Sequence, residues 1–117
     1  MRPLGIHHVA INVTDVSRSI DFYTRLLGGS AREDRPDLGI AGAWIDLGAQ
    51  QVHLVELPVP ADAGQHFAVL VEDVAAAVAE LRASGMDVAD PVRVGDDLQT
   101  FVADPDGNVV ELHQVGA

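Results

Sequence analysis

An internal repeat with a constant offset of 58 residues constrains the fold of this 117-residue chain more than any other feature. Residues 8–16 align with residues 66–74 position by position, and both segments begin with His and end with Asp-Val. The same offset carries later residues of the first copy onto the second: Ile20 onto Val78, Asp46 onto Asp104, His53 onto Glu111 and Leu54 onto Leu112. This register, with no insertion between residues 8 and 112, predicts two copies of one supersecondary unit.

Each copy begins with a predicted strand followed by a predicted helix. Apolar and polar residues alternate over 6–13 and 66–72, which is typical of a strand with two different faces. Asp15 and Asp73 are suitable N-caps for the helices, and Gly28 and Gly85 stand where the helices are expected to end. The apolar stripes of the helices are Val16, Ile20, Tyr23 and Leu27 in the first copy and Val74, Val78 and Leu81 in the second.

Three more strands are predicted after each helix, at 30–35, 41–47 and 50–57 and at 86–93, 97–103 and 108–115. Turn-forming residues at 47–49 and 104–107 separate the last two strands of each copy. Each copy is therefore a βαβββ module, and the fold class is α+β with the helices outside and an open cup inside. We expect one domain over 1–117, made of module 1 (1–57), an irregular linker (58–64) and module 2 (65–117).

The composition excludes several kinds of chemistry. With no cysteine, the chain has no thiolate nucleophile or thiolate metal site, and with no lysine it has no side-chain amine for a Schiff base. The net charge of -11 and the scattered arginines argue against nucleic acid as a partner. No apolar run is long enough to span a membrane, and residues 1–5 lack the apolar stretch of a signal peptide, so we expect a cytoplasmic protein.

Four residues related by the repeat form a candidate metal site. His8 and His66 begin equivalent strands, while His53 and Glu111 occupy equivalent places in the last strands. Two copies related by a pseudo-twofold axis would bring such equivalent points together. Three imidazoles and one carboxylate suit one divalent ion of Zn, Ni, Co, Mn or Fe.

Any one of the five histidines, taken alone, is equally consistent with a half-buried strand residue. His7 is predicted on the opposite strand face from His8 and is interpreted as a structural or surface residue. His113 shares a face with Glu111, where it either supports that ligand or lies in solvent at the strand end, and we favour solvent. Glu56 is predicted on the Val52 face and exposed.

The chain resembles the vicinal oxygen chelate superfamily, which contains glyoxalase I, extradiol dioxygenases and bleomycin-binding proteins. The resemblance lies in residues 6–15, 22–28, 52–56, 66–69 and 104–112. It implies paired βαβββ modules in a U-shaped mixed sheet around a metal, with ligands from the first and last strand of each module. The residues in those places are the four candidates. Glyoxalase I enzymes usually have two His and two Glu ligands, whereas this chain has His53 where the second Glu is expected.

Three functions are consistent with this site. The first is a glyoxalase-like lyase or isomerase that acts through a metal-chelated enolate or oxyanion, with Glu111 as the catalytic residue that carries the proton. The second is a non-haem Fe(II) ring-cleaving dioxygenase that uses His8, His66 and Glu111. The third is a non-catalytic small-molecule or drug-binding protein, although such relatives have generally lost the ligand set.

Four further residues are candidates for contact with a small-molecule substrate. Arg35 and Arg93 are also 58 residues apart and are predicted at the ends of equivalent second strands, where they are either solvent-facing or grip an anionic group. Trp44 and Phe101 either line the cup or belong to the core. The resemblance and the open sheet edges lead us to expect a homodimer.

Overall fold

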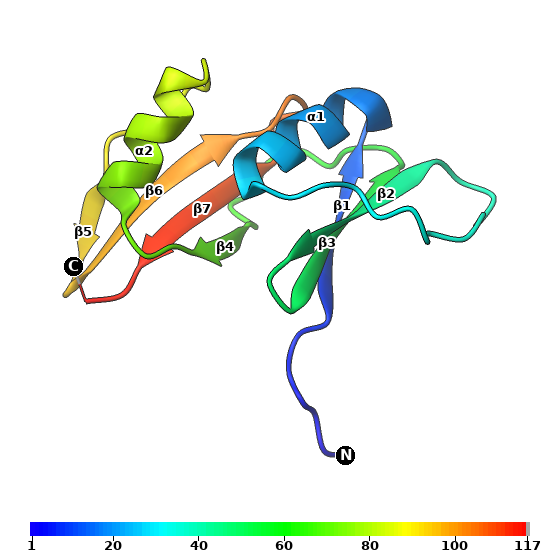
Figure 1. Ribbon diagram of the computed structural model, residues 1–117, viewed down its shortest axis with the longest axis horizontal. Coiled ribbons are helices and arrows are strands. Elements are labelled where there is room, and N and C mark those ends of the chain that lie inside the picture. The colour runs from blue at the N-terminus through cyan, green and yellow to red at the C-terminus, as the bar shows by residue number, and fades with distance from the viewer. Residues whose placement is uncertain (117) are drawn as a thin grey trace. The chain divides into compact units, whose positions relative to one another are not determined.

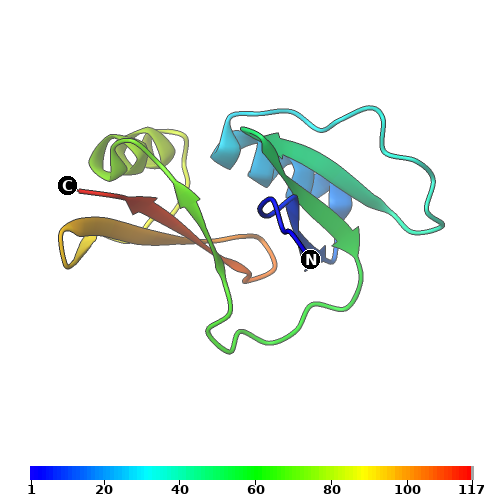
Figure 2. The ribbon, with the colours of Figure 1, turned by 90° about the horizontal axis from the view of Figure 1, so that it is seen from below.

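The computed structural model describes residues 1–116 and divides the chain into two compact units, Met1–Ala61 and Asp62–Ala117. The division falls within the segment 58–64, which is irregular (Figure 2). Each unit has one small sheet and one helix, which gives the α+β class expected from the sequence (Figure 1). In the described residues, no helix is long and apolar enough to cross a membrane.

Unit 1 contains β1 (His8–Val13), α1 (Val16–Leu27), β2 (Gly42–Leu47) and β3 (Gln50–Glu56). The strand order is β1-β3-β2, with β1 parallel and β2 antiparallel to β3. Asp15 caps α1 by accepting a hydrogen bond from the Arg18 amide, and Gly28 ends the helix in the left-handed conformation. Both residues therefore have the predicted capping roles.

Unit 2 contains β4 (Phe67–Leu70), α2 (Val74–Ala83), β5 (Val92–Val94), β6 (Asp97–Ala103) and β7 (Val109–Gln114). The strand order is β4-β7-β6-β5, with β4 parallel to β7. Asp73 caps α2 as predicted, by accepting a hydrogen bond from the Ala76 amide. Gly85 follows the helix with φ of 91°, a value that favours glycine.

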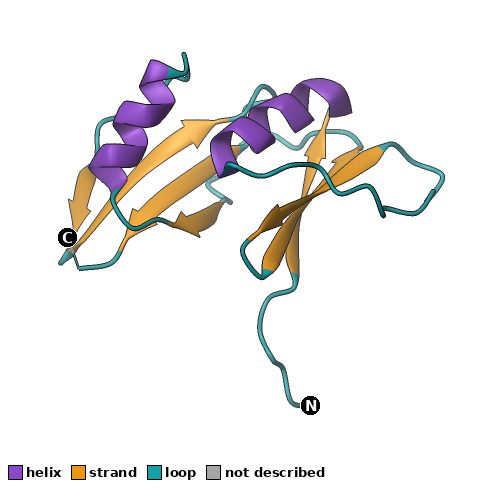
Figure 3. Cartoon of the chain, viewed as in Figure 1, coloured by secondary structure: helices purple, strands orange, loops and turns teal. Residues whose placement is uncertain are grey.

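Each helix covers one face of its own sheet (Figure 3). In unit 1 the layer between α1 and the sheet is formed by buried residues from every element: Val13, Ser19, Tyr23, Ala43, Ile45, Val52 and Leu54. In unit 2 the equivalent layer is Val69, Val74, Val78, Leu81, Val88, Thr100, Val102, Val110 and Leu112. The opposite face of each sheet is left for the side chains that alternate with these residues.

The second strand predicted for each unit, at 30–35 and 86–93, does not form over its expected length. Ala31 and Val88 each form only a single bridge, to Ile45 and Val102 respectively, and β5 follows later in unit 2. The prediction of four strands is therefore wrong for unit 1, where β1, β2 and β3 are the only named strands of residues 1–61. Gly39 and the turns around it keep 32–41 irregular.

The repeat offset is also not constant. The bridges at Ala31 and Val88, and their partners Ile45 and Val102, are 57 residues apart, as are Gly28 and Gly85. The offset returns to 58 at β3 and β7, because the paired positions of the two hairpins differ by one residue: Trp44 pairs with His53, nine residues on, and Phe101 pairs with Glu111, ten residues on. Asp46 and Asp104 are consequently not equivalent: Asp46 is exposed on β2, whereas buried Asp104 accepts hydrogen bonds from the amides of Asp106 and Asn108 in the turn.

Candidate metal centre

The parallel pairing of first and last strands brings the predicted ligands together two by two. In unit 1, Ala10 pairs with His53, so His8 lies two residues before the pairing point. In unit 2, Ala68 pairs with Glu111, and His66 lies two residues before that point. The offset of 58 therefore holds for all four predicted ligands, and each unit contributes one pair.

His53 in unit 1 lies between two aromatic rings. Its imidazole stacks on His8, with ring centroids 3.8 Å apart, and on Trp44, with centroids 4.7 Å apart. Only 9% of His53 is exposed, and its Nε2 is 2.7 Å from Gln51 Oε1, which accepts the hydrogen bond. Burial, and then the nearby His8, lower the pKa of His53 and favour its neutral form, the form that binds metals.

The alternation predicts His7 on the opposite face of the sheet from His8, and this prediction is wrong. It precedes β1, and its Nδ1 is 2.9 Å from His8 Nδ1. Its ring also meets the His53 ring edge to face, with centroids 6.4 Å apart. Because the strand begins only at His8, the period of two does not extend to residue 7.

In unit 2, His66 and Glu111 form a direct contact. His66 Nε2 is 3.0 Å from Glu111 Oε1, and His66 Nδ1 donates to the Gly64 carbonyl at 2.8 Å. The Gly64 carbonyl and then the Glu111 carboxylate raise the pKa of His66. The side chain of Glu111 is only 11% exposed, so its charge depends on these partners for stabilisation.

His113 supports Glu111 and does not lie free in solvent at the strand end. Its Nδ1 is 2.8 Å from Glu111 Oε2, and its Nε2 is 2.8 Å from Asp97 Oδ2. Asp97 and then Glu111 raise the pKa of His113. The sequence did not predict the role of Asp97. The strand face that Glu111 and His113 share did indicate the contact between those two residues.

The pair in unit 2 fits a metal ion. His66 Nδ1 donates its proton in a hydrogen bond to the Gly64 carbonyl, so Nε2 is the nitrogen that faces Glu111 and is available to a metal. The 3.0 Å separation of His66 Nε2 and Glu111 Oε1 is that of a hydrogen bond, and two donors at about 2.1 Å from a tetrahedral ion would be about 3.4 Å apart. The donor types therefore suit Zn or another first-row divalent ion, which would replace the proton between these two atoms after a small increase in their separation.

The pair in unit 1 has suitable donor types in a different arrangement. The His8 and His53 rings are within 13° of parallel, so their ring nitrogens point along separate planes and not at one point. A rotation of one side chain is needed before both rings can bind the same ion. Neither unit, over residues 1–116, groups three or more His or carboxylate side chains as a metal site.

The two arginines predicted as an equivalent pair have different surroundings. Arg35 lies in the irregular segment before β2, where its Nη2 donates to the Ile40 carbonyl, and Arg93 lies on exposed β5. Arg35 packs so closely against Gly42 that a Cβ there would clash with it. The prediction that Arg35 and Arg93 lie at the ends of equivalent second strands is therefore wrong, because those strands do not form at their predicted length.

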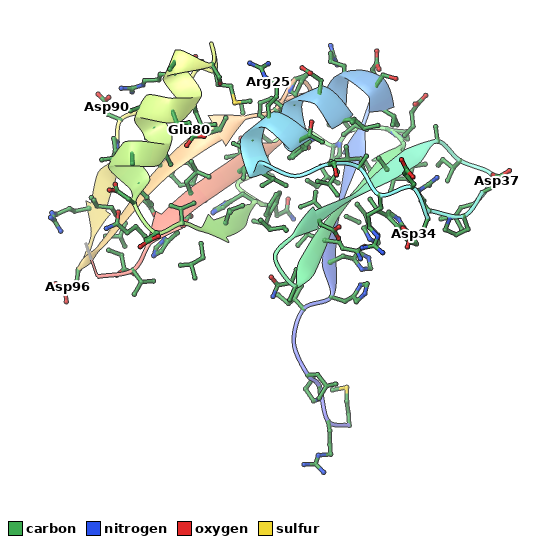
Figure 4. The ribbon with its side chains drawn as sticks, in the orientation of Figure 1. Arg25, Asp34, Asp37, Glu80, Asp90 and Asp96 are labelled. Atoms are coloured by element: carbon green, nitrogen blue, oxygen red, sulfur yellow. The ribbon has the colours of Figure 1, made fainter. Side chains whose placement is uncertain are left out.

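A pocket in unit 1 surrounds Arg35 and is lined by residues that include Asp15, Ser17, Asp37 and Glu56. Glu56 is exposed, as predicted, and borders this pocket. Asp37, which Figure 4 labels on the loop before β2, is one of these lining residues. The carboxylates outnumber the single arginine, so the pocket does not favour an anion.

Trp44 and Phe101 lie beside the predicted ligands and outside the buried cores. Trp44 pairs with His53 across β2 and β3, and Phe101 pairs with Glu111 across β6 and β7. Phe101 also meets the His66 ring edge to face, with centroids 5.4 Å apart. Both aromatic residues are half-buried, so they provide apolar surface next to each pair of ligands.

Relatives of this chain are enzymes with a named activity. A lactoylglutathione lyase of Escherichia coli O157:H7 is 32% identical over 90% of this chain and 88% of that protein. The lactoylglutathione lyase GLX1 of Arabidopsis thaliana is 34% identical over 93% of this chain but only 44% of its own length. The chain thus spans less than half the length of this plant relative.

The fold and the family agree with these relatives. A solved structure of a glyoxalase family protein from Bacillus anthracis superposes with a TM-score of 0.84 over 97% of this chain and 98% of that chain, at 26% identity. The family model described as the glyoxalase/bleomycin resistance protein/dioxygenase superfamily matches residues 5–112. This chain belongs to the glyoxalase/bleomycin resistance protein/dioxygenase superfamily.

Proposed function

We propose that this chain is a metal-dependent lyase or isomerase of the glyoxalase type, with one divalent ion held by His8, His53, His66 and Glu111. The observation that carries the proposal is the pair in unit 2, where His66 Nε2 and Glu111 Oε1 face each other 3.0 Å apart and are suitable donors for one ion. The lowered pKa of His53 supports a neutral third imidazole. Since each unit supplies two donors, the proposal requires the two pairs to meet, within one chain or between two.

In this proposal the residues of unit 2 divide the chemical work. The bound ion supplies Lewis-acid polarisation of substrate oxygens. Glu111 would leave the ion through Oε1, take a proton from a substrate carbon and return it to the neighbouring carbon, while His113 keeps its bond to Oε2. Phe101 would provide an apolar wall beside the reacting group and limit the access of water.

We propose lactoylglutathione, the glutathione thioester in the name of the Escherichia coli relative, as the first compound to test, as the substrate of cleavage or the product of the reverse reaction. The presence of His53 in place of a second carboxylate makes the ligand set one unit more positive than the two-His, two-Glu set expected of glyoxalase I. A substrate that binds as an anion benefits from this difference. The exact substrate is therefore left to the assay below.

A second candidate function is favoured by the surroundings of His53. This ring is stacked between His8 and Trp44 and bonded to Gln51, so it has side-chain partners that can hold it outside the ligand set. His8, His66 and Glu111 would then remain as two imidazoles and one carboxylate. That set is the one used by non-haem Fe(II) oxygenases.

One experiment separates these functions. The protein is loaded in turn with Zn²⁺, Ni²⁺, Co²⁺, Mn²⁺ and Fe²⁺ and assayed for thioester formation from methylglyoxal and glutathione, and for oxygen uptake with catechols. We expect thioester formation, and we expect Glu111→Gln to lower kcat by about 100-fold or more because the proton carrier is lost. Exposed Glu72→Gln is the control. Oxygen uptake with Fe²⁺ alone would support the second candidate, and equal rates for Glu111→Gln and wild type would refute the role of Glu111.

A further inference from the structure

A continuous line of hydrogen bonds runs through unit 2 from a backbone amide to a predicted metal ligand. The Gly116 amide donates to Asp97 Oδ1 at 2.9 Å, and Asp97 Oδ2 accepts from His113 Nε2 at 2.8 Å. His113 Nδ1 then donates to Glu111 Oε2 at 2.8 Å. Asp97 is the first residue of β6, next to Asp96, which Figure 4 labels at the β5–β6 turn.

The donors and acceptors along this line are fixed by their chemistry. A carboxylate only accepts hydrogen bonds, so a His between two carboxylates must donate from both ring nitrogens. The His113 ring is therefore held at both ends, and its side chain is only 24% exposed. The Gly116 amide anchors Asp97 in turn, so no member of the line is free to rotate without breaking a charge-assisted bond.

The consequence falls on the two oxygens of Glu111. His113 occupies Oε2, and Oε1 is the oxygen that faces His66 Nε2 at 3.0 Å. A carboxylate held in this way presents one oxygen to an ion and keeps the other bound to a cation. Without His113, both oxygens would be available and the side chain could turn.

We propose that Asp97 and His113 are positioning residues that orient Glu111 as a ligand through Oε1 alone. The inference rests on the proposed function, since it concerns how Glu111 meets the ion. It goes beyond strand pairing, because the backbone of β6 and β7 is already paired at Gln99 and His113 without these side chains. The side-chain line therefore adds orientation on the face that carries Glu111.

The test measures metal affinity and ligand geometry, not activity. Co²⁺ affinity is determined by competition with a chelator, and the visible absorption spectrum of the Co²⁺ protein reports the number and kind of ligands. We expect His113→Leu to weaken Co²⁺ binding by about 10- to 100-fold and to change the spectrum, because Oε2 is released. His113→Asn retains a donor near the Nδ1 position, so it should restore part of the affinity.

Two further variants separate positioning from stability. Asp97→Asn leaves His113 in place but removes its charged partner, and should weaken Co²⁺ binding in the same direction. Thr100→Val is the matched control, since buried Thr100 on β6 bonds to the Ala89 carbonyl, away from the Glu111 face. It should lower the melting temperature and leave the Co²⁺ affinity and spectrum unchanged.

The outcomes distinguish this inference from the proposed function. If wild type binds Co²⁺ and both His113→Leu and Asp97→Asn keep its affinity and spectrum, the positioning role is wrong while the proposed metal site stands. If the variants lose only as much Co²⁺ affinity as Thr100→Val does, the line of hydrogen bonds stabilises the fold without orienting Glu111, and the inference is again wrong. If wild type does not bind Co²⁺, both proposals are refuted.

Discussion

At the scale of single residues, Asp97 connects the C-terminal backbone of unit 2 to His113 and, through His113, to the predicted ligand Glu111. Its two oxygens accept hydrogen bonds from the Gly116 amide and from His113. These two contacts, the amide first, lower the pKa of Asp97 from its ordinary value. The ionised carboxylate therefore stabilises the folded state more than the unfolded state.

This shift predicts a pH dependence with a definite sign. A carboxyl with a lowered folded-state pKa contributes stability that is present above its unfolded pKa of about 3.9 and is lost as the pH falls through the folded value. The melting temperature of the metal-free wild type should therefore exceed that of Asp97→Asn at pH 6, and the difference should shrink on acidification toward pH 2. Asp96→Asn, at the exposed turn, is the control. A difference that stays constant with pH would contradict the assignment.

The four metal candidates illustrate which residues the sequence could identify. His8, His53, His66 and Glu111 were predicted from equivalence in the repeat, which related His8 to His66 and His53 to Glu111. Strand pairing instead makes neighbours of His8 and His53 in unit 1 and of His66 and Glu111 in unit 2. Asp97 could not be predicted, because its contact with His113 depends on how β6 pairs with β7. Short-range patterns carry no information on that register when the connecting turn changes length.

At the scale of elements, each helix begins at an aspartate whose side chain accepts a hydrogen bond from a backbone amide of the first turn. Asp73 has an extended backbone and accepts from the Ala76 amide at 2.9 Å, and Asp15 has the same role in α1. These carboxylates lie at the positive ends of the helix dipoles. The caps fix the start of each helix relative to the preceding strand, and hence the direction in which the helix crosses its sheet.

Replacing this cap gives a prediction for α2. Asp73→Ala should lower the free energy of unfolding by about 1 kcal/mol, because the Ala76 amide loses its partner. Chemical denaturation monitored by circular dichroism measures this loss. Glu72→Ala, at the exposed position just before, should change the stability little. Equal effects from the two substitutions would show that the cap does not stabilise α2.

The elements also show why the predicted repeat was only partly correct. The offset of 58 holds for first strands, helix starts and last strands, and it slips to 57 at the bridges of Ala31 and Val88. The slip is hidden in the sequence because the longer turn before β7 restores it. The segment 30–35 forms only one bridge, because its residues 32–35 are all charged and are followed by Pro36 and Gly39, which do not continue a ladder.

At the scale of the whole molecule, each sheet leaves edge strands within its own unit. The edges are β1 and β2 in unit 1 and β4 and β5 in unit 2. Leu70 on β4 is 74% exposed, and Leu57, just after β3, is 44% exposed. Open edges and exposed apolar side chains favour association with another polypeptide surface.

A homodimer is therefore the expected state in solution. Light scattering should give a mass of about twice 12.4 kDa at micromolar concentration. A mass of 12.4 kDa, unchanged on concentration, would contradict this prediction.

Mixing inactive variants locates the pairs of ligands. If the pairs meet between two chains, a mixture of His8→Ala and Glu111→Ala restores metal binding, because one of the two sites in the mixed dimer has all four ligands. If they meet within one chain, no mixture restores binding.

The central claim is that His8, His53, His66 and Glu111 together hold one divalent ion. Elemental analysis of protein purified without a chelator or a His-tag, after incubation with excess Zn²⁺, tests it most directly. The account predicts about one ion per chain in wild type and in the exposed control Glu72→Ala, and a large loss in each alanine variant of the four ligands. Absence of near-stoichiometric metal in wild type, or undiminished metal in His8→Ala and Glu111→Ala, would contradict it.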